Sequence, residues 1–136
     1  MSRSLAGTRV RKRAVCVVIL NPKGHVLAVG RPGLPGKFGL PGGHVEPGES
    51  LSQAISRETA EETGALLVSE RVVYQHQADG TDVTCYVGRF IGKPFPAEGL
   101  PVAWVPPAAL CSSSNSPFAG FNRGLFSSMR RQGYRV

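Results

Sequence analysis

The stretch GHVEPGESLSQAISRETAEETGA, residues 43–65, is the most acidic part of a basic chain. Six of the nine acidic residues lie between Glu46 and Glu70, although the net charge of the 136 residues is +7. Three of these acids fall within one helical turn, namely Glu58, Glu61 and Glu62. Acids gathered in this way indicate either a bound cation or a solvated acidic surface.

The same stretch contains the start and stop signals of a helix. Ser50 with Gln53 three residues later is the capping-box pattern, and Gly64 is typical of a residue that ends a helix. We therefore predict a helix over residues 50–63. A helical wheel places its first apolar residues on the same face as the three acids, so the apolar stripe becomes acidic without changing face. The members of that stripe are Leu51, Ala54, Ile55, Glu58, Glu61 and Glu62.

Carboxylates at positions i, i+3 and i+4 of a helix repel one another unless positive charge lies between them. Ligands that offer only oxygen favour hard cations, so the pattern predicts Mg²⁺, with Mn²⁺ as the alternative. A solvated acidic helix face is the competing interpretation. The segment Leu40–Gly43 favours the metal, because its glycines let a backbone carbonyl approach the cation. Arg57 and Glu49 can pair only if the loop folds back on the helix.

The rest of the chain reads as strands around two helices. We expect a hairpin of strands 14–20 and 25–30, and then a loop over residues 31–43, because this segment holds five glycines and three prolines. After the first helix we expect strands 66–77 and 83–91, joined by a hairpin loop at 78–82, and a strand at 102–105. A helical turn at 106–110 and a helix from Ser116-Pro117 to about Arg131 complete the chain. This order of elements predicts an α/β layered domain with a mixed β-sheet.

Residues 43–65 resemble the Nudix box, G-x5-E-x7-R-E-U-x-E-E-x-G-U, in which U is bulky and apolar. The matching positions are Gly43, Glu49, Arg57, Glu58, Glu61, Glu62 and Gly64, whereas the U positions hold Thr59 and Ala65. The chain is therefore similar to the Nudix hydrolases, and in particular to MutT-like nucleoside triphosphate pyrophosphohydrolases. The resemblance implies the Nudix fold, an α/β/α sandwich, as a single domain over residues 14–136.

Nudix enzymes hydrolyse a nucleoside diphosphate linked to another group X. By the resemblance, Glu58, Glu61 and Glu62 bind Mg²⁺ together with the carbonyl of Gly42, and Glu58 is our first choice for the base. Arg57 belongs to the catalytic set because it holds the loop through Glu49.

Three further residues outside the box are candidates by the same resemblance. Glu98 stands in a Glu-Gly-x-Pro-x-x-Trp-like loop, where the MutT-type glutamate reaches the metal, and a solvated loop acid is the alternative. Arg31 would bind substrate phosphate unless it is a surface cation. Asn115 begins an Asn-x-Pro sequence like the one that binds a purine edge in MutT-type enzymes, and a plain turn residue is the alternative.

The expected function is a Mg²⁺-dependent pyrophosphohydrolase that converts nucleoside or deoxynucleoside triphosphates to the monophosphate and pyrophosphate. The alternatives are a Nudix hydrolase of sugar nucleotides, dinucleotides or RNA 5′ ends, and a non-catalytic nucleotide-binding regulator. Nucleic acid is not the expected partner, because no RNA-binding module is present. A small nucleotide is the expected partner, and the chain is a candidate homodimer.

The remaining features set the context of the domain. Residues 1–13 form a basic N-terminal segment, expected to be flexible, and their charge would also attract polyanions. No apolar run approaches transmembrane length, so a membrane is not expected. Three widely spaced cysteines without metal-ligand spacing favour free thiols in the cytoplasm.

Overall fold

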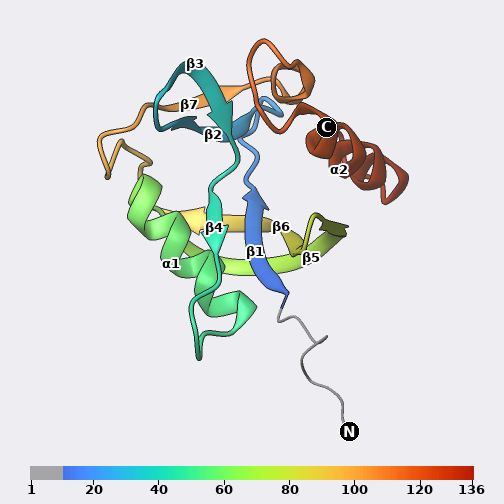
Figure 1. Ribbon diagram of the computed structural model, residues 1–136. Helices are drawn as coiled ribbons and strands as arrows, with labels where there is room; N and C mark the ends of the chain where they lie inside the picture. Colours follow the sequence, from blue (N-terminus) through green and yellow to red (C-terminus); the bar gives the residue numbers. More distant parts are fainter. Residues whose placement is uncertain (1–10) are drawn as a thin grey trace, which may run out of the picture.

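The computed structural model describes residues 11–136, and its larger sheet has four strands. Figure 1 shows how the strands and helices are arranged. Their order is β4-β1-β6-β5. β1 and β6 are parallel, and the other two pairs are antiparallel, so the predicted mixed sheet is confirmed. The strands are β1 (Lys12–Val18), β4 (Gly42–His44), β5 (Leu66–Ala78) and β6 (Thr81–Ile91). β1 begins two residues before the expected position, and residues 1–10 of the basic segment lie outside the described residues.

A second, antiparallel sheet has the order β3-β2-β7, with β2 (Val26–Arg31), β3 (Leu34–Gly39) and β7 (Val102–Val105). The prediction of a loop over residues 31–43 is therefore wrong, because β3 and β4 lie within it. Arg31 pairs with Leu34 across a two-residue turn, in which Gly33 has a φ of +70° that suits glycine. Pairing with β2 thus outweighs the low strand propensity of this segment.

The expected hairpin of the first two strands exists only at its turn. Leu20 and Val26 form a single bridge, and Asn21 accepts hydrogen bonds from the backbone of Lys23 and His25. Beyond that point β1 and β2 diverge into different sheets. The two long strands β5 and β6 form the larger hairpin, which is joined more tightly than expected through Asp79-Gly80.

The first helix, α1 (Leu51–Thr63), begins one residue after the predicted start, because Ser50 is its N-cap, and ends where predicted. The side chain of Ser50 accepts a hydrogen bond from the backbone of Gln53, and the side chain of Gln53 accepts one from the backbone of Ser50. Gly64 ends the helix in the left-handed conformation. The second helix, α2 (Ala119–Arg131), begins later than expected. Ser116 caps a turn instead, since its hydroxyl accepts from the backbone of Phe118. The expected helical turn is present as a 3-10 helix at Pro107–Cys111, one residue later than predicted.

The larger sheet separates two apolar cores. Residues of β1 alternate between them: Val15 and Val17 pack with Ala54 and Ile55 of α1, whereas Val18 packs with a group that includes Leu125, Phe126 and Met129 of α2. The helices therefore cover opposite faces of the sheet, which confirms the α/β/α sandwich. Among the described residues, no helix is both long and apolar enough to cross a membrane.

Candidate active site

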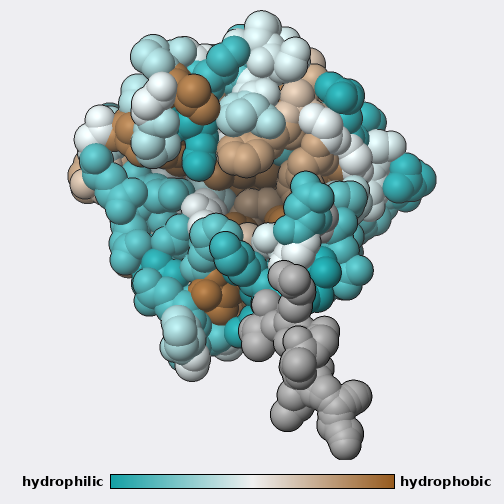
Figure 2. Space-filling view, in the orientation of Figure 1, coloured by the Kyte–Doolittle hydropathy of each residue, from teal (hydrophilic) through white to brown (hydrophobic). Residues whose placement is uncertain are grey.

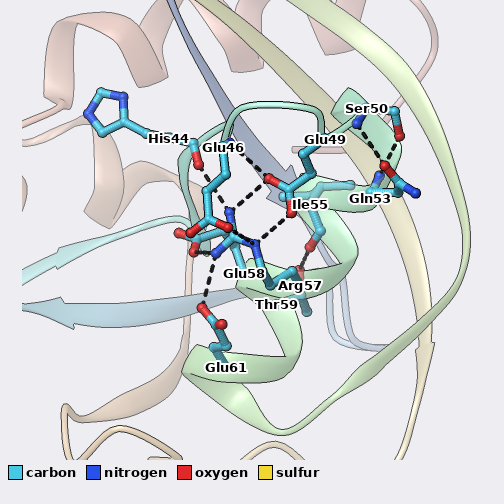
Figure 3. Close-up of polar contacts among 10 residues, drawn as sticks. All are labelled: His44, Glu46, Glu49, Ser50, Gln53, Ile55, Arg57, Glu58, Thr59 and Glu61. Atoms are coloured by element: carbon cyan, nitrogen blue, oxygen red, sulfur yellow. Dashed lines mark hydrogen bonds and ion pairs between the residues drawn. The ribbon is translucent and has the colours of Figure 1, made fainter.

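Arg57 fixes the loop that precedes α1 (Figure 3). Its Nε lies 2.7 Å from one oxygen of Glu49, and its Nη2 donates to the other oxygen at 3.0 Å. The same Nη2 donates to the carbonyl of His44 at the end of β4. The expected pairing of Arg57 with Glu49 is thus present, and it ties the loop to both β4 and the helix. The hydrogen bond from Arg57, with one from the backbone of Glu46, lowers the pKa of Glu49 to about 2.

Glu49→Gln should therefore weaken the fold in a pH-dependent way. The folded-state pKa is below the ordinary value of 4.5, so the carboxylate stabilises the fold fully above about pH 4.5 and loses this effect as the pH falls towards 2. Chemical denaturation of both proteins between pH 7 and pH 2 measures the difference in unfolding free energy. We expect a constant difference above pH 4.5 that shrinks below it. A difference that grows on acidification would contradict the ion pair.

Arg57 also contacts two of the three helix acids (Figure 3). Its Nη1 lies 2.6 Å from Glu58 Oε1 and 3.1 Å from Glu61 Oε1. The side chain of Glu58 is only 15% exposed, whereas that of Glu61 is 48% exposed. Burial raises the pKa of Glu58 although Arg57 opposes the shift. One guanidinium thus contacts several carboxylates, and its positive charge does not fully offset the effect of burial on Glu58.

Glu62 extends towards β4. Its Oε1 accepts a hydrogen bond from the backbone N–H of Gly42 at 3.0 Å. Burial, together with the negative charges of Glu58 and Glu98, raises the pKa of Glu62 to about 7 against the lowering effect of that hydrogen bond. Arg31 acts in the opposite direction. Glu98 and Arg31 are distant in sequence, but both lie close enough for their charges to act on Glu62.

The two glycines of β4 make this approach feasible. A Cβ on Gly43 would overlap the carboxylate of Glu58, and a Cβ on Gly42 would overlap the carbonyl of Val15 on β1. Only glycine lets the strand lie against both β1 and the acidic face of α1. The carboxylates of Glu58 and Glu62 therefore lie directly beside the backbone of β4.

The donor set fits a hard divalent cation. Two carboxylates, those of Glu58 and Glu62, are held in partial burial with raised pKa values, and such groups gain most from a cation. The set is only partly assembled, however: within residues 11–136, no three His, Cys, Asp or Glu side chains are gathered as ligands. The reason is Arg57, which pairs with Glu58 and Glu61 while Glu62 turns to Gly42.

A cavity of about 610 Å³ begins at these glycines and extends between β1, the β5–β6 hairpin and α2. Figure 2 shows apolar side chains in a hollow near the centre of this face. Four rings line the cavity: Tyr74, His76, Phe118 and Phe121. Tyr74 and His76 are stacked with centroids 6.1 Å apart, and Phe121 meets both edge-on. The volume is typical of a small-molecule site, and the rings offer flat surfaces for a planar group.

Asn122 lines this cavity and was missed by the sequence reasoning. It is 1% exposed, and its Nδ2 donates to the carbonyl of Leu110 at 2.8 Å. Because a carbonyl can only accept, Nδ2 must face Leu110, so Oδ1 is the amide atom left for a ligand. No donor to Oδ1 is found among the residues that the structure describes. An amide within the apolar stripe of Leu125, Phe126 and Met129 was the available signal.

A comparison with protein families identifies the family of the chain. The model of the NUDIX domain matches residues 10–127. The chain belongs to the NUDIX domain family. The expected resemblance to MutT-like Nudix hydrolases is confirmed by relatives and by solved structures.

Two curated relatives show how far the likeness extends. A Bacillus subtilis protein, whose name proposes 8-oxo-dGTP diphosphatase activity, is 37% identical over 99 residues, which is 69% of this chain and 66% of that protein. The nucleoside triphosphatase NudI of Klebsiella pneumoniae is 33% identical over 81 residues, or 57% of each chain. The match thus spans less than two thirds of either relative.

A solved structure adds support from the fold. It comes from a study of MutT from Aliivibrio salmonicida and Vibrio cholerae, is 28% identical, and has a TM-score of 0.69. The alignment covers 84% of this chain and 98% of that one. The likeness therefore extends well beyond the Nudix box to most of the domain.

The candidates outside the Nudix box are placed differently from one another. Arg31 lines the cavity, and its guanidinium lies 5.0 Å from the ring centroid of Phe118. Asn115 is not among the cavity residues. Its backbone carbonyl accepts a hydrogen bond from Phe38, which joins it to β3. The structure thus brings Arg31 to the Nudix site and places Asn122, rather than Asn115, in the wall of the cavity.

Proposed function

We propose that the chain is a Mg²⁺-dependent pyrophosphohydrolase that converts nucleoside or deoxynucleoside triphosphates to the monophosphate and pyrophosphate. The observation that carries the proposal is the junction at Gly42-Gly43, where the acidic face of α1 meets a cavity of nucleoside size. A nucleoside in the cavity would place its 5′ phosphates beside Glu58 and Glu62. The relatives named for nucleoside triphosphates support the same substrate class.

Glu58, Glu61, Glu62 and the carbonyl of Gly42 would hold the metal. A bound Mg²⁺ neutralises phosphate charge and lowers the pKa of water. Glu58 is our candidate for the group that accepts the proton of the attacking water, because its carboxylate is partly buried and lies directly beside Gly43 of β4.

The other charged residues would orient the reactants. Arg57 would keep the helix acids and the loop in place through its contacts with Glu49 and His44. Arg31 would bind substrate phosphate at the edge of the cavity. Glu98 would add a further negative charge to the metal site near Glu62. Its charge already raises the pKa of Glu62.

A substrate panel tests this function. Purified protein with Mg²⁺ is given normal and oxidised nucleoside triphosphates, sugar nucleotides and dinucleoside polyphosphates, and the release of pyrophosphate and of phosphate is followed separately. We expect pyrophosphate from the triphosphates and little else. Turnover confined to sugar nucleotides or dinucleotides would show that one of these, and not a nucleoside triphosphate, is the substrate class. Metal-dependent binding without turnover of any substrate would favour a nucleotide-binding regulator.

We expect Asn122 to form a hydrogen bond with the nucleobase of the substrate. Asn122→Ala removes the acceptor Oδ1, and losing one buried hydrogen bond costs about 1–3 kcal/mol, so KM should rise by roughly five- to a hundredfold for a base that donates an N–H. Asn115→Ala is the matched control and should leave KM within about twofold. Steady-state kinetics on folded protein measure both. A larger rise for Asn115→Ala would return base recognition to the Asn-x-Pro sequence.

A further inference from the structure

Helix α2 contains a glycine that its own backbone does not require. Gly124 lies in the interior of α2 and does not have a positive φ, so other residues could adopt its conformation. Glycine destabilises a helix interior relative to alanine, because it loses more conformational freedom on folding. The reason for a glycine at this position must therefore lie in the space around it.

The space beside Gly124 is occupied by the tip of Tyr74, which extends from β5. A Cβ on Gly124 would lie 2.7 Å from the hydroxyl oxygen of Tyr74 and 3.5 Å from its Cζ. The first distance is too short for two atoms that are not hydrogen-bonded, whereas the second is an ordinary van der Waals contact. The hydroxyl group of Tyr74 is thus what excludes a side chain at this position.

Helix α2 is not free to move away from Tyr74. Leu125 and Phe126, which follow Gly124, are fully buried in the core. Farther along, Gln132 Nε2 donates to the carbonyl of Val73 at 2.8 Å, at the bulge that directly precedes Tyr74. Because α2 is fixed to β5 in this way, a methyl group at residue 124 would displace the Tyr74 ring and not the helix.

Tyr74 connects Gly124 to the cavity that we assign to the nucleoside. Its ring lines this cavity, is stacked with His76 and meets Phe121 edge-on. We call these three rings the aromatic wall. Gly124 itself is not among the residues that line the cavity, so it can affect a bound base only through Tyr74.

We propose that Gly124 is a positioning residue for base binding, because the space it leaves lets the Tyr74 hydroxyl lie against α2 and holds the aromatic wall where the nucleobase stacks. The inference rests on the proposed function and assigns the nucleobase to a particular surface of the cavity. Glycine at this point of α2 thus lowers helix stability in exchange for the position of a ring in the cavity.

The test is a double-mutant cycle of Gly124→Ala and Tyr74→Phe. Tyr74→Phe removes only the hydroxyl group, so the Cβ of an alanine at residue 124 then meets nothing closer in that ring than Cζ. Guanosine 5′-monophosphate is the binding probe, because its base offers two neighbouring N–H groups to the acceptor expected at Asn122. Calorimetry measures its Kd, and steady-state kinetics with GTP and Mg²⁺ measure kcat and KM.

Gly124→Ala alone should raise Kd and KM by about three- to twentyfold, which is part of the effect of losing one stacked ring. Its kcat should stay within about twofold, because the acids of α1 are untouched. In the Tyr74→Phe protein, the same substitution should change Kd by less than about twofold. Ser127→Ala, which also raises the helix propensity of α2, is the control and should leave Kd within about twofold. Thermal melts check that each variant is folded.

Three results would contradict these assignments. An equal rise in Kd in both backgrounds, or no rise in either, would overturn the inference and leave the proposed function intact. The expected pattern of Kd values in a protein that hydrolyses no triphosphate would overturn the proposed function and support the inference. A wild-type protein that neither binds the monophosphate nor hydrolyses a triphosphate would overturn both.

Discussion

Glu62→Gln is expected to reduce Mg²⁺-dependent turnover by about three orders of magnitude, since a metal site supplies several kcal/mol of transition-state stabilisation. Gln keeps an oxygen that can accept the N–H of Gly42, so the contact between α1 and β4 is preserved. The change therefore removes the negative charge with little effect on shape. Steady-state kinetics at saturating substrate measure the loss. Turnover within tenfold of wild type would remove Glu62 from the metal site.

The same variant should be more stable than the wild-type protein when no divalent metal is present. Burial raises the pKa of Glu62 to about 7, so ionising it destabilises the fold as the pH rises from its ordinary value of 4.5 through 7. At pH 8 with EDTA, Glu62→Gln should therefore have the higher melting temperature, and Mg²⁺ should raise the melting temperature of the wild type only. A lower melting temperature for the variant in EDTA would contradict the role of buried charge.

Gly43→Ala is expected to have the second largest effect. A Cβ at this position would overlap the carboxylate of Glu58, so the acid has to move away from β4. The backbone of Gly43 does not have a positive φ, and an alanine is therefore compatible with the strand itself. We expect kcat to fall by about a hundredfold or more, because the base and metal ligand is displaced, while KM changes little.

Kinetics together with a thermal melt distinguish this effect from general unfolding. A melting temperature close to that of the wild type with a low kcat would support displacement of Glu58. A kcat close to that of the wild type would show that Glu58 does not need its position beside the strand.

The acidic helix could be predicted from the sequence because its signals are local. The capping box at Ser50, the stop at Gly64 and the spacing of the acids are all read within a few turns. The ion pair of Arg57 with Glu49 follows from the same segment, since Glu49 directly precedes the N-cap residue and Arg57 lies in the second turn of the helix.

The strands of residues 34–44 could not be predicted in this way. Glycine and proline give this segment a low strand propensity, and its pairing partners are β2 and β1, which a local pattern does not reveal. Asn122 was missed for a related reason. The Asn-x-Pro sequence drew attention to Asn115, whereas Asn122 is recognised only when α2 is seen to close the cavity.

The most direct test of the central claim, that the acidic face of α1 binds a divalent cation, is a Mn²⁺ titration followed by the electron paramagnetic resonance signal of the free ion. The wild-type protein, Glu62→Gln and Glu70→Gln are compared, because Glu70 lies outside the site and accepts a hydrogen bond from Ser52 that Gln can also accept. We predict that the wild type and Glu70→Gln reduce the free-ion signal alike and that Glu62→Gln binds at least about tenfold more weakly. Equal Mn²⁺ binding by all three proteins would contradict the claim.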